Sequence, residues 1–254
     1  MTRRRFLCAS GMAAAAPNDT INLGLIGCGA RGRGVHIPRF LKLPGVRFTA
    51  VCDVNSKYME QGKALAGGER VVAYHDYRKL LESKDVDAVV IGSNQQWHAL
   101  QTIDACRAGK DVYLEKPLGN CIGEGPYVME AWRKHGRIVQ AGTQQRSQEH
   151  YQKAVELIRA GKLGEISEVR AWDYENYWPG PGSPADTAPP AELDWDLYVG
   201  PSAYRAYTAG YECSTHWPMM STSASVMNGL LAQDSSNLAV RRAGMGAPGQ
   251  DGGS

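Results

Sequence analysis

Three glycines near the N-terminus have the spacing of a dinucleotide-binding loop. Gly27, Gly29 and Gly32 form a Gly-x-Gly-x-x-Gly motif that follows an apolar run and precedes a helix-compatible segment. The first glycine would allow a tight turn, the second would let a pyrophosphate approach the backbone, and the third would let helix and strand pack closely. Ala30 and Arg31 complete the loop, and the N–H groups of a helix N-terminus there would favour an anion.

An acidic residue stands where such a site needs one. Asp53 follows Gly32 by 21 residues, at the expected end of the second strand. A carboxylate at that place can accept hydrogen bonds from both ribose hydroxyls of an adenosine, which favours NAD. Lys57 is close enough in the sequence to meet a 2′-phosphate instead. We therefore expect NAD, with NADP as the alternative.

A lysine in the middle of the chain has the chemistry to move a proton. Lys116 stands between Glu115 and Pro117 after a short apolar run, at the edge where parallel sheets bind ligands. A lysine there can hydrogen-bond a substrate hydroxyl and take or return its proton, provided that its pKa lies near the operating pH. Taken alone, such a Glu-Lys pair is more often an exposed surface feature.

Alternating strand-like and helix-like segments must position these residues. Six β-branched runs alternate with helical segments, two of which stop at Gly109 and Gly136. This alternation predicts an α/β fold with a doubly wound parallel sheet. The expected strands are residues 21–26, 47–52, 71–73, 88–91, 112–114 and 138–140, and the expected helices are 56–66, 97–108 and 125–135.

The pattern changes after Gly142. Residues 147–160 place apolar side chains on one helical face and lead into a strand-like run at 166–174, which predicts the opening of a second, α+β domain. Residues 178–190 contain five prolines, so we expect no regular structure there. Residues 208–254 have few charges and no sustained period, and no domain is recognisable in them.

Composition excludes several classes of protein. The chain has 254 residues, of which 43% are hydrophobic, so it is not mainly disordered. Its net charge of +2 owes three positive charges to the first five residues, and the near-neutral remainder predicts no nucleic-acid partner. No apolar run approaches the ~20 residues that would cross a membrane. The six cysteines lack metal-ligand spacing, so no metal site is expected.

The first residues resemble a twin-arginine export signal. Arg3, Arg4 and Arg5 precede Phe6 and an alanine-rich apolar stretch that ends before Pro17. We therefore expect residues 1–20 to be a signal and the protein to be exported or periplasmic. A cytoplasmic protein with a basic start is the alternative, because the apolar stretch is short.

The stretch of residues 108–118 contains Glu115-Lys116-Pro117. Together with residues 87–91 and 97–100, this stretch resembles the Gfo/Idh/MocA oxidoreductase family. The resemblance covers residues 21–207 and is strongest over 21–146. It implies an NAD(P)-binding Rossmann domain at residues 21–146. It also implies that Lys116 is the catalytic or nicotinamide-contacting residue and that Glu115 belongs to the cofactor site.

Two further stretches align with the same family. Ser93, Asn94 and Gln95 occupy the family's polar turn after the fourth strand, which implies that they contact the cofactor. His98 is the histidine of that turn and a second catalytic candidate, unless it caps or packs its own helix. Gln144 and Arg146 follow the sixth strand, where the resemblance implies contacts with nicotinamide and substrate.

The sequence also departs from the family. Members continue into a Gly-x-x-x-Asp-x-Gly-x-His-type motif, and none occurs after Tyr207. We therefore expect residues 147–207 to be the start of an incomplete substrate and dimerisation domain, so that oligomerisation is doubtful. A truncation or altered reading frame after about Tyr207 would produce this pattern, and lineage-specific divergence is the alternative.

Three functions are compatible with these expectations. The first is an NAD(P)-dependent oxidoreductase that acts on a sugar, a polyol or a related hydroxylated small molecule. The second is an NAD-dependent glycosidase that oxidises its substrate transiently. The third is an inactive or binding-only fragment that holds a dinucleotide without turnover. In the first two, the partner is a small carbohydrate-like substrate.

Overall fold

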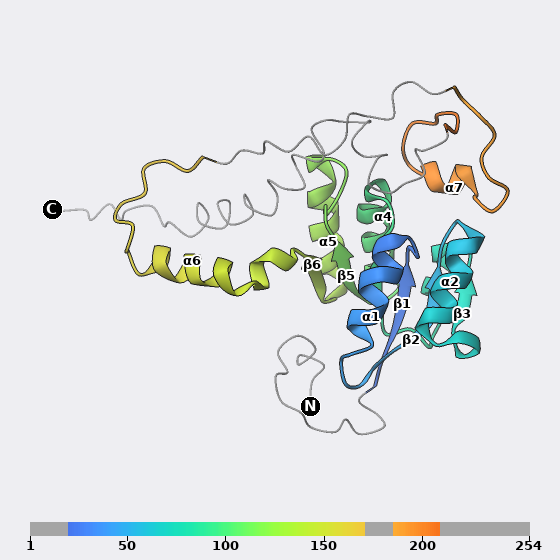
Figure 1. The fold of residues 1–254 in the computed structure, drawn as a ribbon, viewed down its shortest axis with the longest axis horizontal. Helices are drawn as coiled ribbons and strands as arrows, with labels where there is room; N and C mark the ends of the chain where they lie inside the picture. The colour runs from blue at the N-terminus through green and yellow to red at the C-terminus, as the bar shows by residue number, and fades with distance from the viewer. Residues whose placement is uncertain (1–19, 171–184, 209–254) are drawn as a thin grey trace.

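The core of the structure is a parallel sheet (Figure 1). This computed structural model describes residues 20–170 and 185–208. Within them the sheet has six strands in the order β3-β2-β1-β4-β5-β6, which is the order of a doubly wound dinucleotide-binding domain. The strands are β1 (Ile21–Ile26), β2 (Val46–Cys52), β3 (Val72–Tyr74), β4 (Ala88–Ile91), β5 (Asp111–Glu115) and β6 (Val139–Gly142).

Helices cover both faces of the sheet. A π-helical turn (Gly32–His36) with α1 (Ile37–Phe40), together with α2 (Ser56–Ala66), lies on one face. The other face carries α3 (Tyr77–Glu82), α4 (Gln95–Arg107) and α5 (Gly125–His135). Because side chains alternate along a strand, Leu25 of β1 packs under the first set and Ile26 under the second. Short 3₁₀ turns occupy Gly68–Arg70, Ile122–Glu124 and Gln144–Ser147.

Local chemistry explains where the helices begin and end. Asn55 caps α2, since its side chain accepts a hydrogen bond from the backbone N–H of Tyr58. Asp76 caps α3 in the same way. Gly136 ends α5 with a positive φ of 59°, a conformation that suits glycine. The caps at Asn55 and Asp76 fix the turns that follow β2 and β3 at the carboxyl edge of the sheet.

All six predicted strands are confirmed; the ends of β1 and β4 are as predicted, and the ends of the others differ by at most two residues. The sequence did not predict α3, which has only six residues. The expected strand at 166–174 is wrong over residues 166–170, which are exposed and form no strand. A strand needs a neighbouring strand to pair its backbone, and no described segment pairs with this one. Residues 171–174 lie outside the described part.

In the described part of the chain after β6, two α-helices follow the sheet. The amphipathic α6 (Glu149–Arg159) extends away from the sheet, whereas α7 (Trp195–Val199) returns to the edge near α2 (Figure 1). The described residues contain no helix long and apolar enough to span a membrane. The expected export signal, except for residue 20, and residues 178–184 and 209–254 lie outside the described part of the chain.

Candidate dinucleotide site

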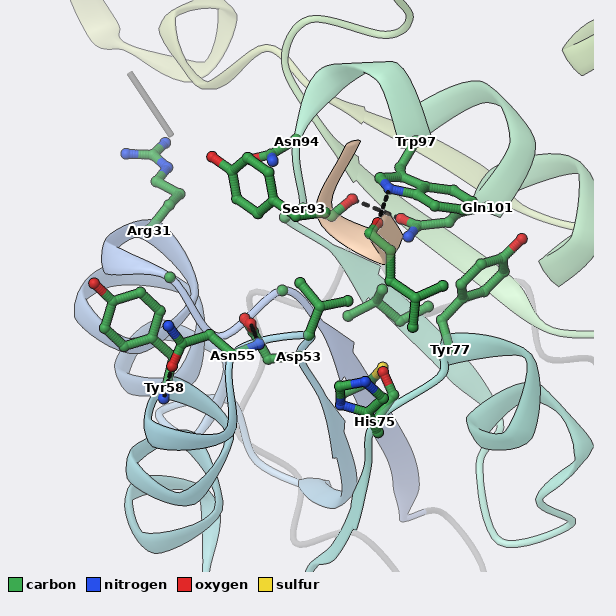
Figure 2. A pocket seen from close by; sticks show the side chains of 18 of the residues that line it. Arg31, Asp53, Asn55, Tyr58, His75, Tyr77, Ser93, Asn94, Trp97 and Gln101 are labelled. Carbon is green, nitrogen blue, oxygen red and sulfur yellow. Dashed lines mark hydrogen bonds between the residues drawn. The ribbon is translucent and has the colours of Figure 1, made fainter. Parts of the chain in front are cut away.

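A cavity opens at the carboxyl ends of β1, β2 and β4, where Arg31, Asp53 and Trp97 mark three of its sides (Figure 2). The sheet order reverses direction between β1 and β4, and open α/β sheets bind their ligands at such a point. The lining combines the glycine-rich turn, the turns after β2, β3 and β4, and residues near α7. It includes Gly27, Gly29, Ala30, Arg31, Asp53, Asn55, Tyr58, His75, Ser93, Asn94, Trp97, Leu193, Leu197 and Tyr198.

The three glycines have three different surroundings. Gly27 has a φ of +99°, and a Cβ there would lie 2.6 Å from the backbone of Gly92 and Ser93. A Cβ on Gly32 would collide with the carbonyl oxygen of Gly27. A Cβ on Gly29 would meet no atom within 4 Å, so the backbone there is open toward the cavity. This is the division of roles that a pyrophosphate-binding turn requires.

Asp53 is held by the backbone and keeps acceptor capacity. Its Oδ2 accepts the N–H of Cys28 at 2.6 Å, and its Oδ1 accepts the N–H of Asn55 at 2.8 Å. Each carboxylate oxygen has about two acceptor sites, so each retains one for a ribose hydroxyl. Burial raises the pKa of Asp53, although these two N–H groups and the nearby Arg33 act in the opposite direction. The predicted alternative contact, Lys57, is exposed and does not line the cavity.

Of the residues that follow β4, some line the cavity and others are buried in the core. Ser93 and Asn94 line the cavity, and the Ser93 hydroxyl donates to Oε1 of Gln101 at 2.6 Å (Figure 2). Gln95 is buried, and its amide donates to Oδ1 of Asn120 at 3.0 Å. The Gln95 side chain thus supports the loop after β5, and its contact with the cofactor stays a prediction.

His98 is buried beside the cavity. Its Nδ1 lies 2.5 Å from the carbonyl oxygen of Pro117, and its Nε2 lies 3.0 Å from that of Ser93. Burial lowers the pKa of His98. Both ring nitrogens face backbone carbonyls, which is what the packing alternative expects, and direct catalysis by His98 stays a prediction. His98 ties the turn after β4 to the turn that contains Lys116.

Glu115 is a buried anchor and does not line the cavity. Its Oε1 binds Nε of Arg31 at 2.5 Å and the amide of Gln144 at 2.8 Å, and its Oε2 accepts the backbone N–H of Lys116 at 2.6 Å. These three donors hold the carboxylate in place, and direct contact of Glu115 with the cofactor stays a prediction. The Lys116 side chain is exposed at the carboxyl end of β5.

The two residues expected at the substrate lie after β6. Gln144 also donates to the hydroxyl of Tyr113 at 3.1 Å, and it lines a second, shallower hollow beside Arg31 and His36. Arg146 is exposed and lines neither hollow. The structure thus places Gln144 next to Glu115. Contact of Gln144 or Arg146 with the substrate stays a prediction.

Sequence reasoning missed several residues of the cavity. The guanidinium of Arg33 lies 4.5 Å from the ring centroid of Tyr58, a cation–π contact at the α2 side of the cavity. Trp97 lines the opposite wall. Leu193 and Leu197 come from a segment about 140 residues beyond Asp53, and no local motif marks them as part of a nucleotide site.

Comparison with known proteins identifies the family. A model of the Gfo/Idh/MocA family, described as an oxidoreductase family with an NAD-binding Rossmann fold, matches residues 21–143. Inositol 2-dehydrogenase/D-chiro-inositol 3-dehydrogenase of Shouchella clausii is 35% identical over 153 residues, or 59% of this chain and 44% of that protein. A glycosyl hydrolase family 109 protein of Saccharopolyspora erythraea is 34% identical over 114 residues, or 42% and 25% of the two chains.

A solved structure agrees with these matches. Scyllo-inositol dehydrogenase from Lactobacillus casei, with bound cofactor NAD(H) and scyllo-inositol, superimposes with a TM-score of 0.54 and 28% identity. The match covers 58% of this chain and 43% of that one. The chain spans less than half the length of these relatives. Residues 21–143 form an NAD-binding Rossmann domain, and through it the chain belongs to the Gfo/Idh/MocA family of oxidoreductases.

Proposed function

We propose that this protein transfers a hydride between NAD and a hydroxylated small molecule of the polyol or sugar class. The observation that carries the proposal is the cavity at the carboxyl edge of the sheet, where the backbone is open at Gly29 and the Asp53 carboxylate keeps acceptor sites for a ribose. Lys116 follows β5, the strand next to β4, at the same edge. The names of the inositol dehydrogenases among its relatives support the substrate class.

The residues present fit the cofactor. The remaining acceptor sites of Asp53 would take the two ribose hydroxyls of the adenosine half, and a 2′-phosphate would face a negative charge there. The backbone around Gly29 and Ala30 would bind the pyrophosphate at the start of the helical turn. When bound, NAD⁺ supplies the acceptor for a hydride.

Lys116 is the residue that handles the proton. Oxidation of a secondary alcohol breaks a C–H bond, whose electron pair leaves with the hydrogen, and releases the hydroxyl proton. Lys116 as a neutral amine would take that proton, and as an ammonium group it would return it in the reverse reaction. Glu115 holds the backbone N–H of Lys116, which fixes where the lysine side chain begins.

The test measures NADH formation by the full chain with NAD and a panel of inositols and sugars. We expect at least one compound to be oxidised and Lys116→Ala to lower the rate by about 10²–10⁴, the usual contribution of a general acid–base group. Lys84→Ala, which removes an exposed lysine outside the cavity, is the control. Unchanged turnover by Lys116→Ala would refute its role. Binding of NAD without turnover of any compound would favour the binding-only alternative.

The glycosidase remains a second candidate because of the family 109 relative. In that reaction, oxidation of a sugar carbon makes the neighbouring C–H bond acidic, and loss of this proton with the leaving alcohol breaks the glycosidic bond. Water then adds to the resulting double bond, and the hydride returns to the oxidised carbon. NADH would therefore not accumulate. We expect NADH to rise in proportion to product, whereas glycoside cleavage at constant NADH would establish the second candidate.

We also propose export of the protein through its N-terminal arginines. Residues 1–20 fused to a reporter protein would carry the reporter out of the cytoplasm, and replacement of Arg3 and Arg4 by lysine would abolish this export. A reporter that stays in the cytoplasm with the unaltered segment would favour the cytoplasmic alternative.

A further inference from the structure

The chain segment of residues 190–200 lies against the same cavity as the glycine-rich turn. Leu193, Leu197 and Tyr198 are among the lining residues. Leu193 and Tyr198 belong to a small apolar cluster that packs against Val54, the residue after Asp53. The match to the family model ends at residue 143, so it does not include this wall.

Backbone and side-chain hydrogen bonds tether the segment to the turns after β2 and β3. The backbone N–H of Ser56 donates to the carbonyl of Glu192 at 2.9 Å, and that of Asp194 donates to the carbonyl of Val54 at 3.0 Å. The carboxylate of Asp194 lies 2.9 Å from Nε2 of His75. The segment is therefore attached to the turns that follow β2 and β3.

The start of α4 provides a second attachment. The indole N–H of Trp97 donates to the carbonyl of Leu197 at 2.9 Å (Figure 2), and the amide of Gln96 donates to the carbonyl of Tyr198 at 3.0 Å. Gly200 lies directly against the ring of Trp97, with which a Cβ at Gly200 would collide. The segment thus bridges the two sides of the cavity.

We propose that residues 190–200 are the outer wall of the adenine subsite, and that the segment must be docked for the dinucleotide to bind tightly. This inference rests on the proposed binding of NAD. Asp53 would fix the ribose, so the attached base must lie next to it, in the space bordered by Val54, His75 and Leu193. A planar purine suits such a mostly apolar slot with a few polar groups at its rim.

Docking and binding are coupled under this proposal. A ligand that binds only the docked form has an apparent affinity reduced by the fraction of molecules that are docked. A substitution that undocks the segment therefore weakens binding without touching Asp53 or the glycine-rich turn. Conversely, bound ligand holds the segment in place and slows the opening of its backbone hydrogen bonds.

Two glycines with a positive φ provide a test variant, Gly200→Ala, and a control variant, Gly136→Ala. In Gly200→Ala the new methyl group collides with Trp97, and the residue has a φ of +56°. In Gly136→Ala, at the end of α5, φ is +59° and the methyl group meets no atom within 4 Å. Both residues have a positive φ, but Gly136 is in the αL conformation with a ψ of 36°, whereas Gly200 has a ψ of −127°. Gly200→Ala therefore combines backbone strain with the collision against Trp97, and only this variant displaces the wall. The second variant does not touch the cavity.

The experiment titrates the full-length protein and both variants with ADP-ribose, which carries the adenosine and pyrophosphate without nicotinamide. We expect Gly200→Ala to weaken binding at least about tenfold and Gly136→Ala to stay within about twofold of the unaltered protein. Equal affinities of the two variants for ADP-ribose would overturn the proposal that residues 190–200 form the wall of the adenine subsite. If the unaltered protein binds neither ADP-ribose nor NADH, the proposed function itself fails.

A second measurement protects the test against misfolding of Gly200→Ala. Amide hydrogen exchange of the unaltered protein is followed over residues 190–200 with and without ADP-ribose. We expect exchange in this segment to slow on binding, together with exchange around Asp53. Slower exchange around Asp53 with no change in residues 190–200 would overturn the proposal.

Discussion

Arg31 and Glu115 form an ion pair in which Nε of Arg31 lies 2.5 Å from Oε1 of Glu115. Arg31 stands in the glycine-rich turn, and Glu115 immediately precedes Lys116. The pair therefore connects the loop that would bind pyrophosphate to the strand end that carries the proton-handling lysine. The Glu115 side chain is only 5% exposed and that of Arg31 is 42% exposed, so the carboxylate end of the pair is shielded from water.

Replacement of Glu115 tests that connection. In Glu115→Gln the new amide N–H groups face the donors of Arg31 or Gln144, so we expect a loss of about 1–3 kcal/mol in the free energy of unfolding. Urea denaturation measures this loss. Glu69→Gln, at a side chain that is 96% exposed, should change stability by less than about 0.5 kcal/mol. Equal losses in the two variants would contradict a structural role for the buried pair.

The glycines predict two opposite phenotypes. Gly32→Ala places a methyl group against the Gly27 carbonyl, so we expect it to destabilise the fold by about 1–3 kcal/mol. Gly29→Ala adds its methyl group to open space in the cavity wall, so it should keep its thermal stability while losing about tenfold or more in NADH affinity. Thermal unfolding and NADH titration of both variants check this contrast. A stable Gly32→Ala, or a Gly29→Ala that binds NADH normally, would contradict it.

The buried His36 should make the stability of the fold sensitive to acid. Burial lowers the pKa of His36 to about 4, although the nearby Glu115 opposes this shift. The unfolded chain, with an ordinary pKa of about 6.5, binds the proton more readily, so stability falls as the pH decreases from about 6.5 toward 4. Urea unfolding at several pH values measures the slope. His36→Asn should lose this part of the slope, and an identical slope in the variant would refute the assignment.

The fold was predictable because its signals are local. Each strand is a short apolar run, and the helices are marked by caps such as Asn55 and stops such as Gly136. The glycine spacing and Asp53 likewise belong to one continuous stretch of sequence, and the structure places them around one cavity. Short elements such as α3 lack enough residues for a period to be recognised.

The roles of side chains were harder to predict because they depend on distant partners. Glu115 was expected at the cofactor, but its carboxylate is bound by Arg31, 84 residues away in the sequence. His98 was one of two catalytic candidates, and only the folded chain shows both of its nitrogens against backbone carbonyls. The position of residues 190–200 against the cavity could not be predicted, since the hydrogen bond between Trp97 and Leu197 spans 100 residues of sequence.

NADH fluorescence titration of the full chain and of Asp53→Asn tests whether Asp53 binds the ribose of NAD. We expect saturable binding by the unaltered protein and a loss of about 10–100-fold in Asp53→Asn, the value of a charged hydrogen-bond acceptor. Because burial raises the pKa of Asp53, affinity should also fall on acidification before an ordinary aspartate would be protonated, and only in the unaltered protein. Absence of NADH binding by the unaltered protein, or an affinity of Asp53→Asn equal to that of the unaltered protein, would contradict ribose binding by Asp53.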